Sequence, residues 1–68
     1  MIEVTLMGKG EHVLYLNPHQ IEYIEENGSI TTIVMLSGKR LTVEEKYPVL
    51  LDRIIRYRKQ IGAFKNEE

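Results

Sequence analysis

Apolar and polar residues alternate along most of the chain up to residue 44, with turn residues between the alternating runs. Ile2, Val4 and Leu6 lie two positions apart, which is the spacing of a half-buried strand. Asn17-Pro18 and Asn27-Gly28 interrupt the alternation, and such pairs are typical of turns. The pattern predicts five strands, at about residues 2–7, 12–16, 21–26, 30–36 and 40–44.

The period then changes to that of a helix. An apolar stripe with helical spacing consists of Tyr47, Leu50, Leu51, Ile54 and Ile61. Pro48 suits a first helical turn, and Gly62 suits the position just past a helix end. We therefore expect a helix over about 48–61 and a frayed tail over 63–68. The predicted fold is a small α+β domain, in which one C-terminal helix packs on one face of an antiparallel sheet of about five short strands.

The strand expected at 30–36 is apolar on both of its faces, whereas a single helix can cover only one face of a sheet. Loops and long side chains could shield the second face, or that face could meet a copy of the chain or a partner. We expect Ile24, Ile33 and Met35 to lie on the second face and to mediate self-association. A charged residue at position 33 should then give a folded monomer.

Length and composition narrow the class of protein. The chain has 68 residues, which is the length of one domain with a thin core. It has no cysteine, so neither a disulfide nor a thiolate zinc site can stabilise that core. Small domains of this kind often self-associate, and we expect a homo-oligomer. A net charge of −1 argues against strong binding to nucleic acid. Neither a signal peptide nor an apolar run of about 20 residues is evident, so we expect a cytoplasmic protein that contacts membranes at most peripherally.

Residues that could carry chemistry are few and scattered. His12 and His19 lack the spacing of zinc ligands, and Gly8-Lys9-Gly10 lacks the spacing of a phosphate-binding loop. The glutamates near position 25 fit a solvated face, because acid–base catalysis needs a carboxyl group with a raised pKa in a closed pocket. We therefore expect a protein that is not an enzyme, with no catalytic residue, cofactor, metal or small-molecule substrate.

Basic residues recur along the predicted helix. Arg53, Arg56 and Lys59 are spaced by three and would form a basic ridge away from the apolar stripe. The ridge is either an ordinary solvated face or a surface that docks an acidic protein, an anionic membrane leaflet or nucleic acid. We take these three residues as candidate partner-binding residues.

Several short motifs lie along the chain, namely Leu16-Asn17-Pro18, Ile21-Glu22, Ile24-Glu25, Gly38-Lys39, Val43 and Ile55-Arg56-Tyr57-Arg58. Together they resemble the FlbD family of small bacterial flagellar proteins. The resemblance covers residues 2–61 and implies a stand-alone domain that supports flagellar motor function and motility through protein contacts, with no enzymatic activity. One departure matters for the fold. Glu44-Glu45-Lys46 stands where the family carries Lys-Glu-Ser, so a serine that would cap the helix is missing.

A second resemblance is to the middle of LytTR-type DNA-binding domains. Residues 21–25, Gly38 and the following helix carry it. In that family further strands follow the helix, whereas only seven residues follow Ile61 here. A DNA-binding module involved in transcription regulation is therefore the alternative function.

Overall fold

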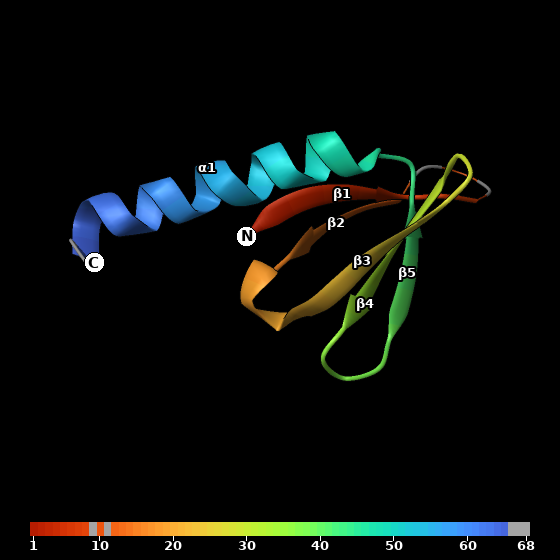
Figure 1. The fold of residues 1–68 in the computed structure, drawn as a ribbon, viewed down its shortest axis with the longest axis horizontal. Helices are drawn as coiled ribbons and strands as arrows, with labels where there is room; N and C mark the ends of the chain where they lie inside the picture. The colour runs from red at the N-terminus through yellow and green to blue at the C-terminus, as the bar shows by residue number, and fades with distance from the viewer. Residues whose placement is uncertain (9, 11, 66–68) are drawn as a thin grey trace.

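The computed structural model describes residues 1–8, 10 and 12–65, and it confirms the small α+β fold. The five strands form one open antiparallel sheet in the order β2-β1-β5-β4-β3, and the single α-helix lies along one side of it (Figure 1). The elements are β1 (Ile2–Leu6), β2 (His12–Leu16), the 3-10 helix η1 (Pro18–Gln20), β3 (Ile21–Asn27), β4 (Ile30–Met35), β5 (Arg40–Val43) and α1 (Tyr47–Lys65).

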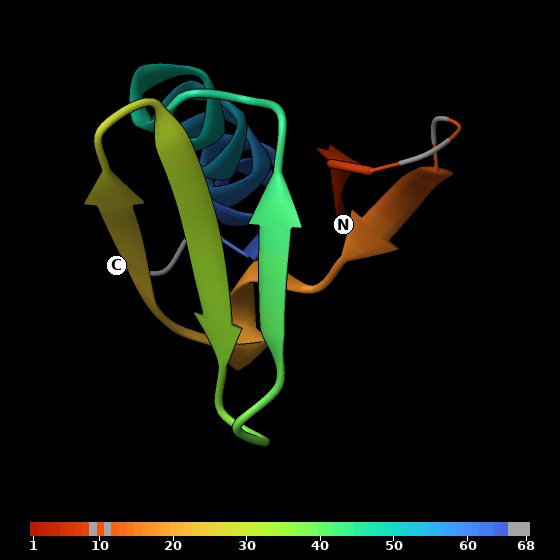
Figure 2. The ribbon, with the colours of Figure 1, turned by 90° about the vertical axis from the view of Figure 1, so that its right-hand side faces the viewer.

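The sheet consists of two well-paired parts that meet at one short junction. β1 pairs with β2 over five residues, and β4 pairs with both β3 and β5. β1 and β5 share only the Leu6–Val43 pair, flanked by hydrogen bonds from the Met7 N–H to the Thr42 carbonyl (2.9 Å) and from the Glu44 N–H to the Thr5 carbonyl (2.8 Å). Figure 2 shows β3, β4 and β5 side by side in front of α1, with β2 at the opposite end of the sheet.

A small apolar core lies between the sheet and α1. Its buried members are Ile2, Val4, Ile33, Val43 and Leu50. Leu50 comes from the first half of α1, and Ile54 and Tyr57 continue the same helical face with partial burial. The helix therefore follows a 3.6-residue period, but Tyr47 and Leu51 of the predicted stripe are each 38% exposed and do not belong to the core. The core is as thin as a chain of this length implies.

A β-bulge decides which residues of β3 face that core. Ile21 pairs with Met35, but the next aligned pair is Tyr23 with Val34, so β3 contains one extra residue at this point. The bulge turns Ile21 to the same face as Ile24, and both pack against the core. Strict alternation would place Ile21 and Ile24, which are three positions apart, on opposite faces.

The burial pattern corrects the expected self-association surface. Ile33 is 0% exposed at the centre of the core, and the partly buried Ile24 and Met35 pack against the core. These three residues lie on the face that α1 covers, because Ile33 shares the core with Leu50. They stabilise the monomer and are not available to a second copy. The exposed apolar residues at the two ends of β4 are instead Ile30 and Leu36.

Long side chains shield the middle of the second face. Val34 is 5% exposed although it lies opposite the core, and its neighbours on the two flanking strands are Tyr23 and Arg40. Arg40 Nη2 donates a hydrogen bond of 2.6 Å to Glu25 Oε1. That bond, together with Tyr23, raises the pKa of Arg40 above its ordinary value. Side chains from both flanking strands thus cover Val34, which was one of the two interpretations of this two-sided strand.

The bounds of α1 differ from the expected ones at both ends. The helix begins at Tyr47 and continues to Lys65, so Gly62 lies inside it and not beyond its end. Residues 66–68 of the expected frayed tail lie outside the described residues. At the other end, the Tyr47 N–H donates to Glu26 Oε2 (3.3 Å). A glutamate from β3 therefore provides an acceptor at the helix start, where the missing serine would have been expected to act.

Candidate functional site

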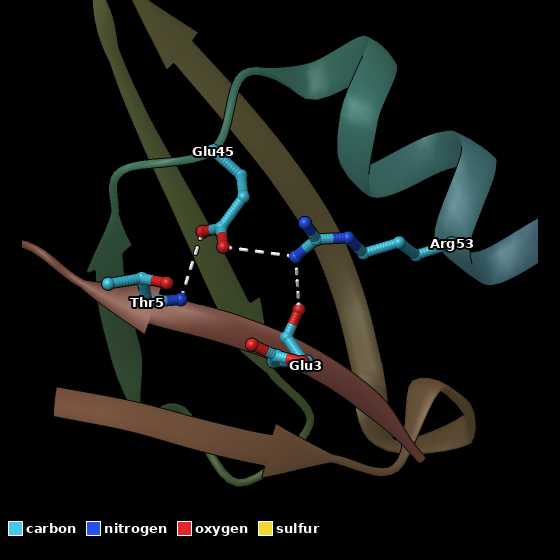
Figure 3. A network of polar contacts seen from close by, with 4 residues as sticks. All are labelled: Glu3, Thr5, Glu45 and Arg53. Carbon is cyan, nitrogen blue, oxygen red and sulfur yellow. Dashed lines mark hydrogen bonds and ion pairs between the residues drawn. The ribbon is translucent and has the colours of Figure 1, made fainter.

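A network of polar contacts includes the carboxylate of Glu45, which lies between β5 and α1. Its Oε1 accepts a hydrogen bond from the Thr5 N–H (2.9 Å), and its Oε2 accepts one from Arg53 Nη1 (3.0 Å). The same Arg53 nitrogen donates to the Glu3 carbonyl (2.7 Å), as Figure 3 shows. One carboxylate and one guanidinium group thus hold the middle of β1 against α1.

The surroundings of Glu45 favour its charged form. The side chain is only 10% exposed. Burial acts to raise its pKa, but the hydrogen bonds from Thr5 and Arg53 outweigh burial, and the pKa of Glu45 is lowered from its ordinary value of 4.5. A general acid at neutral pH needs a raised pKa, so this carboxylate is suited to a structural role.

The predicted basic ridge is divided in the structure. Arg53 points toward β1 and is engaged with Glu45 and Glu3. Arg56 pairs through Nε with Asp52 Oδ2 (3.0 Å) in an exposed position, and Lys59 is exposed. Of the three residues of the predicted ridge, Arg56 and Lys59 therefore remain as surface cations that a partner could contact.

Among the residues that the structure describes, open grooves lie on two sides of α1. One, of about 380 Å³, lies between β3 and the start of the helix and is lined by Ile21, Tyr23, Ile24, Glu26 and Tyr47. The other, of about 290 Å³, lies where β1 begins and is lined by Met1, Ile2, Glu3, Arg53, Arg56, Tyr57 and Gln60. The charged side chains of Glu26 in the first groove, and of Arg53 and Arg56 in the second, bond within the molecule.

The histidines are not brought together. His19 belongs to η1, and its ring meets Tyr57 of α1 edge-on with the ring centroids 5.8 Å apart. His12 begins β2. Across residues 1–8, 10 and 12–65, no group of three or more histidine, cysteine or acidic side chains is arranged to hold a metal ion.

A family model for FlbD, the flagellar and swarming motility proteins, matches residues 1–62. The chain belongs to the FlbD family. The match runs from the start of β1 into the last turns of α1, so the Glu45 network and both grooves lie within the family domain. No curated protein and no solved structure matches the chain. In the described part of this FlbD-family protein, no helix is both long and apolar enough to cross a membrane.

Sequence patterns missed the residues that join the elements. Glu26 was expected on a solvated face and Arg53 in a partner-binding ridge, and no pattern drew attention to Glu45. Their contacts join positions 8 to 50 residues apart, so periodicity could not reveal them. The only signal was the missing serine at the helix start, which implied that another acceptor must replace it.

Proposed function

We propose that this protein is a non-enzymatic, cytoplasmic accessory protein of flagellar motility that acts through contacts with other proteins. The family match over residues 1–62 is the observation that carries the proposal. The open grooves beside α1 support a binding role over a catalytic one. Their charged residues Glu26, Arg53 and Arg56 already bond within the molecule. The absence of cysteine fits a reducing compartment.

Exposed apolar side chains on α1 support a protein partner. Tyr47, Leu51 and Ile55 succeed one another at intervals of four residues, so they form one row along the helix, and all three are exposed. The row begins at Tyr47, which also lines the groove beside β3. Aromatic and aliphatic side chains of this kind are enriched in the centres of protein interfaces, and charged residues are common at the rim.

We place the basic part of the partner surface at Arg56 and Lys59 and leave Arg53 out of it. Arg53 is bound to Glu45 and the Glu3 carbonyl, so changing it would alter the fold before it altered a partner contact. We do not extend the proposal to DNA binding, the LytTR-like alternative. With a net charge of −1 and Arg53 engaged internally, little positive charge is left to contact phosphates.

The test is a clean deletion strain, scored for swimming and swarming with flagella counted by microscopy. Normal flagellar number with reduced motility is the expected result and would place the action at the motor. Normal motility would overturn the proposal, and loss of flagella would move the role to assembly.

Complementation then addresses the partner surface. The variant Arg56→Glu/Lys59→Glu should fold but fail to restore motility, because both side chains lie on the surface of α1. Lys39→Glu, a charge reversal in the exposed turn between β4 and β5, is the matched control and should restore motility. Full rescue by the double variant would remove the basic residues from the proposed surface.

A further inference from the structure

The two edges of the open sheet differ in how they are protected against pairing with another strand. β3 forms one edge, and it contains the bulge and three glutamates, Glu22, Glu25 and Glu26. β2 forms the other edge. Its five residues, HVLYL, contain neither a charged side chain nor a proline, and all five are in regular register with β1. Proteins commonly use charges, prolines and bulges to keep edge strands from pairing, and β2 has none of them.

The outward side chains of β2 are large and apolar. Val13 pairs with Thr5 and Tyr15 pairs with Glu3, on the face away from the core, and they are 46% and 65% exposed. Leu14 and Leu16 point to the opposite face, where they pack against the core. The inner face of β2 thus fixes the strand in place, while its outer face and its free edge are open.

A free edge accepts another extended chain, because its outward N–H and C=O groups bond only to water until a strand pairs with them. We propose that β2 pairs in antiparallel fashion with β2 of a second copy, about a two-fold axis at Leu14. The two sheets then become one continuous sheet. Val13 of each copy lies opposite Tyr15 of the other, which is a favourable pairing of a β-branched with an aromatic side chain.

A second copy suits this edge because the strand is complementary to itself. Leu14 meets Leu14, Val13 meets Tyr15 and His12 meets Leu16, so no like charges oppose the pairing within His12–Leu16. The contact is isologous and consumes the β2 edge of both chains, while the glutamates and the bulge protect the β3 edges. The assembly therefore closes at a dimer and does not grow into a filament.

An interface of five paired residues lies at the small end of the range for specific complexes, so we expect a weak dimer whose population rises with protein concentration. This inference does not rest on the proposed role in motility. It concerns the purified protein alone, so its failure and the failure of the motility proposal are distinguishable.

The test needs no partner. The mass of the purified chain is measured in solution by light scattering and by sedimentation, up to millimolar concentration. We expect the average mass to rise from 7.9 kDa toward twice that value. Hydrogen exchange should show amide protection within His12–Leu16 that increases with concentration. A mass that stays at the monomer value throughout would overturn the proposal and leave the β2 edge for a strand of another protein.

Charge placement tests the register. Val13→Lys/Tyr15→Lys sets lysine opposite lysine twice and should raise the dissociation constant at least about tenfold. Val13→Lys/Tyr15→Glu sets lysine opposite glutamate and should restore pairing. Leu36→Lys, at an exposed apolar residue far from β2 in the sheet order, is the control and should dimerise like the wild type.

All of these positions are exposed in the monomer, so circular dichroism should show that the variants fold. Equal dissociation constants for the two double variants, or dimer loss in Leu36→Lys, would overturn pairing about Leu14.

Discussion

Replacing Glu45 should destabilise the domain more than replacing Asp52 or Glu26. Glu45→Ala removes the acceptor of the Thr5 N–H and one of the two acceptors of Arg53. A hydrogen bond to a charged acceptor contributes about 1.5–3 kcal/mol, and this acceptor is only 10% exposed. The Arg53 side chain is 36% exposed, so solvent screening limits the ion pair itself to about 0.5 kcal/mol.

We therefore expect Glu45→Ala to lower the free energy of unfolding by about 2 kcal/mol. Glu45→Gln keeps an oxygen that can accept from Thr5 but loses the charge, and should cost about 1 kcal/mol. These are large effects, because a chain of 68 residues with about 0.1 kcal/mol per residue has roughly 7 kcal/mol of stability in all.

The effect of Glu45→Gln should depend on pH in a defined direction. The pKa of Glu45 is lowered in the folded state, so the unfolded chain binds the proton more readily. The stabilisation is therefore complete above the ordinary value of 4.5 and is lost as the pH falls below it. The stability difference between wild type and Glu45→Gln should be constant near neutral pH and should shrink on acidification through this range.

Urea unfolding followed by circular dichroism, at several pH values, measures these quantities. Asp52→Asn is the matched control. The Asp52–Arg56 pair also joins a carboxylate to an arginine, but its two side chains are 59% and 76% exposed. It should change stability by less than about 0.5 kcal/mol. If Glu45→Gln costs no more than Asp52→Asn, or if its cost does not vary below pH 4.5, the network does not act as described.

Three further changes test other parts of the fold by the same unfolding assay. Ile33→Lys should leave the chain unfolded, because it buries an unpaired charge in the core, whereas Leu36→Lys should fold; a folded Ile33→Lys would contradict the assigned faces. Thr31→Val should raise stability by about 1 kcal/mol, since the buried Thr31 hydroxyl has no hydrogen-bond partner among the described residues; a loss would reveal an unseen partner. Glu26→Ala should cost about 0.5–1 kcal/mol through the start of α1, and no change would remove it as a helix cap.

Much of the fold could be predicted from local patterns. The turns at Asn17-Pro18 and Asn27-Gly28 separate strands where expected, and Gly28 adopts a positive φ of 62° that glycine tolerates well. The helical stripe predicted only part of the side of α1 that meets the sheet: Leu50 and Ile54 pack at the core, whereas Tyr47 and Leu51 are exposed. These features depend on residues a few positions apart, so the sequence displays them directly.

The candidate surfaces were harder to predict, because each depends on contacts between distant segments. Counting alternate residues along β3 failed at the bulge, since a single extra residue reverses the faces of everything before it. The spacing of Arg53 suggested a solvent-facing cation, but the position of Glu45 and the Glu3 carbonyl directs its side chain inward. The motifs that resembled FlbD were sufficient for the family, which the match over residues 1–62 confirms.

By itself, the sequence determined the element types, most of their bounds and the family, because periodicity, turn residues and short motifs are local properties of a chain. Only the tertiary structure decided which sheet face α1 covers, which charges are engaged internally and which strand edge is left unprotected. Those outcomes depend on the strand order β2-β1-β5-β4-β3 and on one bulge. Neither leaves a periodic trace in the sequence, because both arise from pairing between segments that are far apart along the chain.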